Sequence, residues 1–133
     1  MNSQNKFQKN KFKKNLLVME YIEISKEIIS LKKKNRYLST IFRNENYYQI
    51  FIILLENFIN QIDIHESKIS KSLNCSKLTT QKYLLDLYEN DIINFELDKV
   101  DKRKKNIILT SNFINELSTF FSIFKNRIDM KGF

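Results

Sequence analysis

The sequence contains no proline and a single glycine, Gly132, which stands near the C-terminus. Proline and glycine interrupt helices more strongly than other residues, so their near absence favours a mostly helical protein. The turns must then be made by Asn, Asp and Ser, whose side chains hydrogen-bond to the nearby backbone. The only cysteine, Cys75, excludes an internal disulfide and is typical of a reducing compartment.

Long apolar runs are also missing, since no segment approaches the roughly 18 residues that span a bilayer. The basic N-terminus is not followed by an apolar stretch and a small-residue cleavage site, which argues against a signal peptide. His65 is the only histidine, and no side chains stand at metal-ligand spacing. No glycine-rich phosphate loop, nucleophile–base pair or carboxylate dyad is apparent. We expect a cytoplasmic protein that is not an enzyme, holds no metal or cofactor and enters no membrane.

What the chain does have is apolar content and positive charge. Its 133 residues are 42% hydrophobic, enough for one domain with a real core. The net charge of +8 indicates an anionic partner, such as nucleic acid, a membrane surface or an acidic protein. Residues 1–36 carry ten Lys/Arg and three Glu, a net of +7, and residues 92–112 carry five Lys/Arg and three Asp/Glu, a net of +2. The charge therefore lies in two separate segments.

The N-terminal third reads as a flexible basic arm, 1–15, followed by a long helix, 16–43. The helix carries a heptad-like apolar stripe formed by Leu17, Tyr21, Ile24, Ile28, Leu31, Leu38 and Phe42, with Asn35 at one stripe position. This stripe can be buried by a partner chain or by the domain's own core. The arm can add affinity for DNA or serve as a solubilising tail, and its two Phe among lysines also suit a membrane surface weakly.

The middle of the chain predicts several short elements in a definite order. A helix from Asn44 or Glu45 to about Asn60 has apolar residues around most of its circumference, so we expect it to be central and buried. There follow a short extended segment at 61–64, expected to be a strand, a helix at 66–73 and a turn at 74–75. The next helix is capped by Ser76 and runs to about 90, with Leu84, Leu87 and Tyr88 facing inward.

The period then changes to alternation, which predicts a strand at 93–97, a basic loop at 98–105 and a second strand at 106–110. Ser111 is expected to cap a final helix whose apolar stripe contains Phe113, Leu117, Phe120 and Phe124, widened by Ile114, Phe121 and Ile128. The order of elements from residue 44 to 110 is that of a winged helix-turn-helix domain, in which one helix enters the major groove of DNA.

Residues 69–77 read Ile-Ser-Lys-Ser-Leu-Asn-Cys-Ser-Lys. This stretch is similar to the helix-turn-helix of the MarR family of transcriptional regulators. Residues 100–110 resemble its wing signature, an Asp-x-Arg followed by basic residues, a strand and Leu-Thr. The spacing between the two matches without a gap, and the resemblance covers about half of the chain, from Ile64 to Thr110. The sequence departs from the family at Ser70, where Ala is usual, at Asp91, where Gly is usual, and after Thr110.

The resemblance implies a homodimeric repressor that binds a pseudo-palindromic operator in double-stranded DNA, with dimerisation helices at 16–43 and 111–133. It implies that Arg103, oriented by Asp101, reaches a minor groove and that the neighbouring lysines contact phosphates. The outward residues of the Ser76-capped helix can read bases in the major groove. The expected DNA-binding residues are Ser76, Lys77, Leu78, Thr79, Gln81, Lys82, Lys99, Asp101, Lys102, Arg103, Lys104 and Lys105.

Other interpretations remain open. The outward helix face and the basic loop can be ordinary solvated surface, and the whole unit can be a module for protein contacts or a replication-initiator domain. Cys75 is expected to be a small buried hydrophobe, with a redox switch as the alternative. A small-molecule effector is compatible with the resemblance, but no residue of the sequence marks a pocket for one.

Overall fold

The computed structural model describes residues 15–130, and the side chains of residues 15–126. The elements in chain order are α2 (Leu16–Lys34), α3 (Arg36–Ile41), α4 (Glu45–Ile59), α5 (Glu66–Leu73), α6 (Lys77–Glu89), β1 (Ile93–Leu97), β2 (Lys105–Leu109) and α7 (Ser111–Met130). The mostly helical fold with a small antiparallel hairpin is confirmed. Of the expected arm only Asn15 is described, and residues 131–133 of the last segment also lie outside the described residues.

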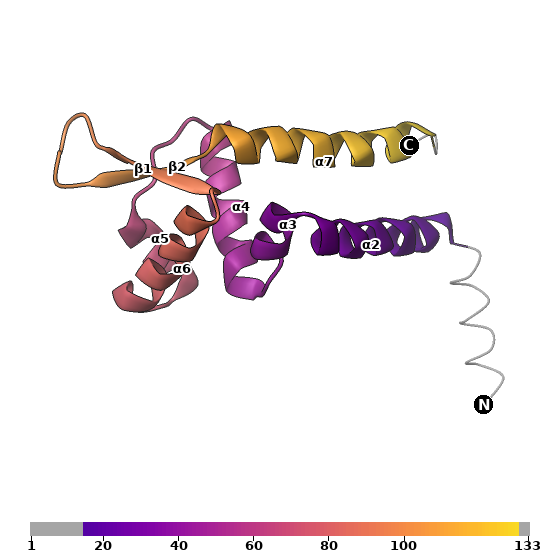
Figure 1. The fold of residues 1–133 in the computed structure, drawn as a ribbon, viewed down its shortest axis with the longest axis horizontal. Coiled ribbons are helices and arrows are strands. Elements are labelled where there is room, and N and C mark those ends of the chain that lie inside the picture. The colour runs from indigo at the N-terminus through magenta and orange to yellow at the C-terminus, as the bar shows by residue number, and fades with distance from the viewer. Residues whose placement is uncertain (1–14, 131–133) are drawn as a thin grey trace, which may run out of the picture.

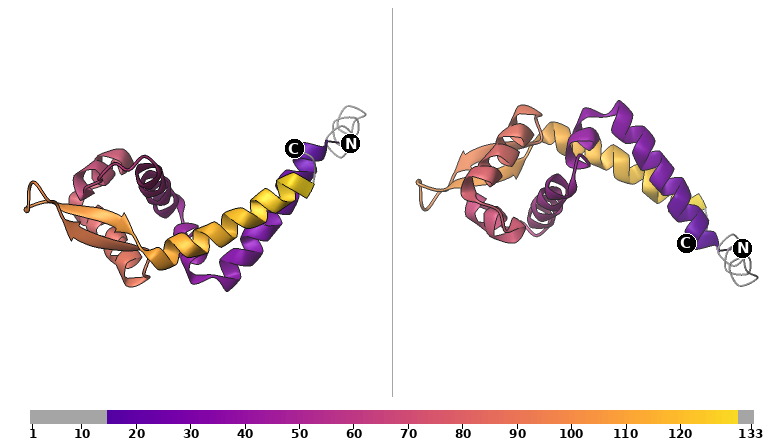
Figure 2. Two further views of the ribbon diagram at one scale, coloured as in Figure 1. Left: turned by 90° about the horizontal axis from the view of Figure 1, so that it is seen from above. Right: turned by 90° about the horizontal axis from the view of Figure 1, so that it is seen from below.

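The described residues form a head and a stalk (Figures 1 and 2). We call the head the unit made by α4, α5, α6, β1 and β2, and the stalk the pair of helices α2 and α7. Both stalk helices extend from the same side of the head, and the tip of the β1–β2 hairpin projects on the opposite side (Figure 1). The hairpin and the stalk are therefore the two extremities of the molecule.

The expected single helix over residues 16–43 is wrong, because the chain breaks at Asn35. Asn35 has extended backbone angles, and its side chain accepts hydrogen bonds from the backbone amides of Tyr37 and Leu38. It also donates to Glu116 of α7 at 2.9 Å. Asparagine competes well for backbone groups at helix starts, so it caps α3 where an apolar residue would have continued α2.

The core is formed by the head, by α3 and by the first turns of α7. Its buried apolar side chains are Leu38, Ile41, Tyr47, Ile50, Phe51, Leu54, Ile64, Ile69, Leu84, Leu87, Ile92, Ile93, Ile107, Leu109, Phe113, Leu117 and Phe120. Helix α7 thus buries its first turns against the head, while α2 contains no buried residue. The apolar side chains of α2 are left for another surface to cover.

Helix α4 is central to the core as expected, but it buries one face and not most of its circumference. Tyr47, Ile50, Phe51 and Leu54 point into the core, whereas Ile52 and Ile59 are exposed. Sequence composition alone could not separate these positions, because α4 has apolar residues on both faces.

The hairpin pairs Ile93 with Leu109 and Leu97 with Lys105. Strand β2 begins and ends one residue earlier than the expected strand at 106–110. The extended segment 61–64 forms no strand. It touches the hairpin through one backbone hydrogen bond, which the amide of Ile107 donates to the carbonyl of Ile64 at 2.9 Å. Gln61 adopts a left-handed conformation (φ 55°), which bends the chain away from a strand path.

Two further details differ from the sequence prediction. Thr110, not Ser111, caps α7, since its hydroxyl accepts a hydrogen bond from the amide of Phe113 at 3.1 Å. Tyr88 is exposed and does not face the core; its ring lies 5.7 Å from that of Phe95 in the hairpin. Within the described residues, no helix is both long enough and apolar enough to cross a membrane.

Candidate nucleic-acid interface

Helix α6 separates its inward and outward faces as the sequence predicted, except at Tyr88, which is exposed. Thr80, Leu84 and Leu87 are buried. The first turn begins at Ser76, whose hydroxyl oxygen accepts a hydrogen bond from the amide of Thr79 at 3.1 Å. The candidate contact residues on this helix and its cap, namely Ser76, Lys77, Leu78, Thr79, Gln81 and Lys82, are all exposed. The N-terminal half of α6 therefore presents amine, amide, hydroxyl and methyl groups to the outside.

The turn before α6 fixes the angle between α5 and α6. Asn74 adopts a left-handed conformation (φ 53°), and the amide of Cys75 donates to the carbonyl of Ser70 at 3.2 Å. Asparagine tolerates this conformation better than most residues other than glycine. Cys75 is half-buried, and its thiol lies 3.6 Å from the carbonyl of Leu73. Its position in the turn fits a small packing residue.

Two carboxylates organise the hairpin loop, 98–104. Asp98 Oδ2 accepts hydrogen bonds from the amides of Val100 and Asp101, and Asp101 Oδ1 accepts from both the amide and Nε of Arg103, each at 3.1 Å. The pKa of Asp98 lies below its usual range because the Asp101 amide donates to it. The Arg103 side chain lowers the pKa of Asp101 in the same way.

The guanidinium of Arg103 is held and yet open to solvent. Its side chain is 91% exposed although Nε is bound to Asp101. Lys99, Lys102, Lys104 and Lys105 are exposed on the same loop and its edge. The loop and the first residue of β2 therefore carry five cations, one of which is oriented by a carboxylate, as the resemblance implied.

The N-terminal half of α6 and the hairpin border one hollow of about 540 Å³. The structure brings Lys77 and Gln81 of α6 to the same hollow as Arg103, Lys104 and Lys105. The full lining is His65, Glu66, Ser67, Ser70, Lys71, Lys77, Gln81, Arg103, Lys104 and Lys105. The other predicted residues lie outside this lining. With five Lys/Arg and one carboxylate, the hollow suits an anionic ligand.

Sequence reasoning missed the contribution of α5 to this hollow. Ser67 and Lys71 stand two residues on either side of buried Ile69, which places them on the opposite face of the helix. That spacing was the signal that could have found them. Glu66 Oε1 and Ser70 Oγ are buried and have no hydrogen-bond partner among the described residues. His65 Nδ1 lies 3.2 Å from the carbonyl of Lys105 and links the start of α5 to β2.

The sequence matches no protein-family model and no curated protein. Solved structures do match the fold. The Staphylococcus aureus MepR–DNA complex superposes with a TM-score of 0.56 at 21% identity, over 86% of this chain and 77% of that one. The fold is a winged helix-turn-helix. The winged helix is also similar to HlyU from Vibrio cholerae, with a TM-score of 0.50 at 17% identity, over 71% of this chain and 92% of that one.

A second MepR structure, bound to ethidium bromide, matches the winged helix with a TM-score of 0.53 at 22% identity, over 84% of this chain and 77% of that one. In this fold α5 and α6 are the two helices of the helix-turn-helix, and β1, β2 and the loop between them are the wing. The fold expected from residues 69–77 and 100–110 is thereby confirmed.

Proposed function

We propose that this protein is a sequence-specific transcriptional regulator of the MarR type that binds double-stranded DNA as a homodimer. The observation that carries the proposal is the hollow in which the exposed start of α6 and the wing cations converge. An α-helix fits the major groove, and an arginine beside it can reach the narrow minor groove. The MepR–DNA complex, which shares the fold, supports this use of the unit.

Within this proposal the contacts have separate tasks. Lys77, Gln81 and their exposed neighbours on α6 read base edges, because lysine donates to guanine and glutamine pairs with adenine. Arg103 enters the minor groove. The wing lysines hold phosphates and carry no sequence information. Lys71 of α5 faces the same hollow and adds a further phosphate contact.

The stalk supplies the dimer in this proposal. Helix α2 carries exposed apolar side chains along its length, with Leu17 at 64%, Tyr21 at 73% and Ile29 at 55% exposure, and no residue of it is buried. Burial of such side chains by a second copy is favourable in proportion to the apolar area removed from water. A dimer would hold two heads at a fixed separation, as a pseudo-palindromic site requires.

The proposal is tested by fluorescence anisotropy with labelled duplexes of about 30 base pairs, long enough for two half-sites one helical turn apart. One duplex comes from the region upstream of the protein's own gene, and a random-sequence duplex of equal length is the control. Titrations run at about 50 mM and about 200 mM salt, and we expect affinity to fall at least about 100-fold between them because several cations neutralise phosphates.

Tighter binding to the upstream duplex than to the random one would establish a sequence-specific regulator that acts on its own promoter. Absence of binding to either duplex at the lower salt would overturn the proposal. The winged helix would then be a protein-interaction module. The next experiment would be a pull-down with the unmutated protein as bait.

A further inference from the structure

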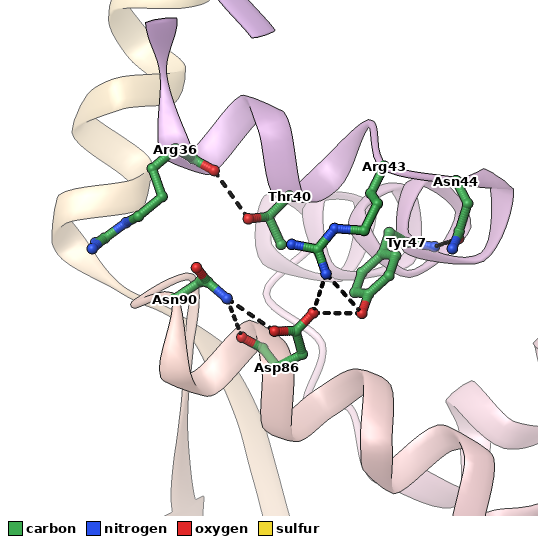
Figure 3. Close-up of polar contacts among 7 residues, drawn as sticks. All are labelled: Arg36, Thr40, Arg43, Asn44, Tyr47, Asp86 and Asn90. Atoms are coloured by element: carbon green, nitrogen blue, oxygen red, sulfur yellow. Dashed lines mark hydrogen bonds and ion pairs between the residues drawn. The ribbon is translucent and has the colours of Figure 1, made fainter. Parts of the chain in front are cut away.

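A cluster of polar side chains joins α6 to the start of α4 and to the segment just before it (Figure 3). Tyr47, in the first turn of α4, donates a hydrogen bond from Oη to Asp86 Oδ2 at 2.5 Å. Arg43, between α3 and α4, donates from Nη1 to the same oxygen at 2.6 Å. Asp86 Oδ1 accepts from Asn90 Nδ2 at 3.0 Å. Both carboxylate oxygens of Asp86 are therefore engaged, and the partners come from two different parts of the chain.

The hydroxyl of Tyr47 is the buried member of this cluster. The residue is 7% exposed, and burial followed by the hydrogen bond to Asp86 raises the pKa of Tyr47 to about 12. Tyr47 therefore remains a donor at physiological pH. Arg43 is about half exposed, so its ion pair with Asp86 adds little to the free energy of unfolding. Its main effect is to orient the Asp86 carboxylate. The ring of Tyr47 also meets that of Tyr83 on α6 edge to face at 4.9 Å.

A second group of hydrogen bonds lies just after the end of α6. Asp91, the second residue after the helix, has a left-handed conformation (φ 61°). Its Oδ2 accepts hydrogen bonds from Tyr37 of α3 at 3.1 Å and from Asn112 of α7 at 3.0 Å. The hydroxyl of Thr110, the cap of α7, donates to the Asp91 carbonyl at 2.6 Å. The turn after α6 is thus hydrogen-bonded to α3 and to the start of α7.

Asp86 lies beyond the proposed DNA contacts on the same helix, four residues after Lys82. It is nine residues after Lys77, a distance of about 13 Å along a helix axis. A tilt of about 10° at Asp86 would move the N-terminal turn by about 2 Å, more than a base-reading contact tolerates. Asp86 can therefore affect DNA binding without touching DNA, by controlling where the start of α6 lies.

We propose that Asp86 is a positioning residue that holds the tilt of α6 against α4 and the segment just before it, and so sets the half-site spacing that a dimer accepts. The inference rests on the proposed function and adds the residue that determines its geometry. The hydrogen bonds from Tyr47 and Arg43 to Asp86 hold α6 in place. The hydrogen bonds of Asp91 fix the point about which α6 would tilt.

The decisive variant is Asp86→Asn, and its matched control is Glu89→Gln, an exposed carboxylate on the same helix. Both substitutions remove one negative charge from a chain of net charge +8, so electrostatics alone would tighten DNA binding slightly in both. Positioning predicts the opposite sign for Asp86→Asn, a weakening of about fivefold to tenfold. Tyr47→Phe, which leaves the Arg43–Asp86 pair in place, is expected to weaken binding in the same direction by less.

The readout that separates positioning from a loss of folded protein is spacing preference. Each protein selects duplexes from a library randomised over about 30 base pairs, the length used for the binding test. The spacing between half-sites in the enriched sequences is then compared. We expect the wild type and Glu89→Gln to enrich one spacing and Asp86→Asn to enrich a broader range. The fraction of active protein is measured by stoichiometric titration below the unfolding temperature of each variant.

If the wild type binds DNA and Asp86→Asn matches Glu89→Gln in affinity and spacing, the inference fails and the proposed function stands. The inference also fails, with the proposed function intact, if Asp86→Asn lowers only the active fraction. If the wild type itself binds neither library nor upstream duplex, the proposed function fails.

Discussion

Arg103 is the residue whose direction in the wing is fixed by another side chain. Asp101 holds both its amide and its Nε, so the guanidinium is oriented before any ligand arrives. Lys99 carries the same charge on the same loop and has no comparable anchor among the described residues. The two residues therefore offer a matched pair in which charge is constant and orientation differs.

We expect Arg103→Ala to weaken binding to the selected duplex about tenfold and to relax its preference for A/T pairs under the wing, because a minor-groove contact is lost. Lys99→Ala should weaken binding to all sequences alike and leave the preference unchanged. Anisotropy titrations against duplexes with A/T or G/C pairs at the flank measure both effects. Equal behaviour of the two variants would mean that the wing contributes charge alone.

Tyr47 gives the stability of the protein a defined dependence on pH. Its folded pKa of about 12 lies above the value near 10 of an unfolded tyrosine, so the folded state holds the proton more tightly. The associated stability is fully present below pH 10 and is lost as the pH rises toward 12, by at most about 3 kcal/mol.

Urea unfolding at several pH values between 9 and 12 should therefore show a steeper decline for the wild type than for Tyr47→Phe. The other titrating groups, lysines included, are common to both proteins and cancel in the comparison. Parallel declines would show that Tyr47 is not held as a neutral donor by Asp86.

The residue types of the candidate site were predictable, but their environment was not. The period of α6 placed Thr80 and Leu84 inward and Lys77 outward from sequence alone. The spacing about Ile69 could have placed Ser67 and Lys71 on the outward face of α5, but that this face borders the wing depends on how the two helices cross. The Tyr47–Asp86 contact joins residues 39 apart, and no local pattern encodes such a pair.

At the scale of elements, helix caps and turns decide where the predicted periodicities stop. The helices of the head and the hairpin followed from apolar spacing to within a residue or two. The break at Asn35 and the absence of a strand at 61–64 did not follow, because each depends on a hydrogen bond to a neighbouring element or on one left-handed residue. Asn74 is also left-handed, and it lies in the turn at 74–75 that the sequence did predict.

We expect Asn74→Ala to lower the free energy of unfolding by about 1 kcal/mol, because a Cβ without a polar side chain is strained in the left-handed region. Asn74→Gly retains the geometry and should lie within about 0.5 kcal/mol of the wild type. Urea unfolding followed by circular dichroism measures both, with unchanged dependence on urea. An equal loss in both variants would assign the effect to the asparagine side chain and not to the backbone.

At the scale of the whole molecule, the stalk carries apolar surface that the head does not cover. Exposed apolar residues recur along α2, and Phe121 of α7 is 45% exposed on the same extension (Figure 1). A single chain leaves this surface in water. The head also exposes apolar side chains, among them Phe58, Ile59 and Leu97. Helix α2 differs from the head helices α4, α5 and α6 in having no buried residue, which makes it the element that a second copy would cover in the proposed dimer.

Light scattering after size exclusion should give twice the chain mass of 16.1 kDa at about 50 μM protein. The dimer fraction should fall as the protein is diluted. Tyr21→Glu on α2 should shift the protein toward monomer by placing a charge in the interface. Leu85→Glu, at an exposed apolar site on α6, is the control that should remain dimeric. A monomeric wild type at this concentration would remove the dimer from the proposal.

The single backbone hydrogen bond from Ile107 to Ile64 makes the wing observable in solution. Amides alternate in direction along a strand, so that of Ile107 points away from β1 while that of Ile108 faces it across from Asn94. Deuterium exchange at Ile107 therefore reports the wing lifting off the segment before α5, and exchange at Ile108 reports melting of the hairpin itself. Slower exchange at Ile107 alone upon ligand addition would mean that the ligand clamps the wing to the helices without stiffening the hairpin.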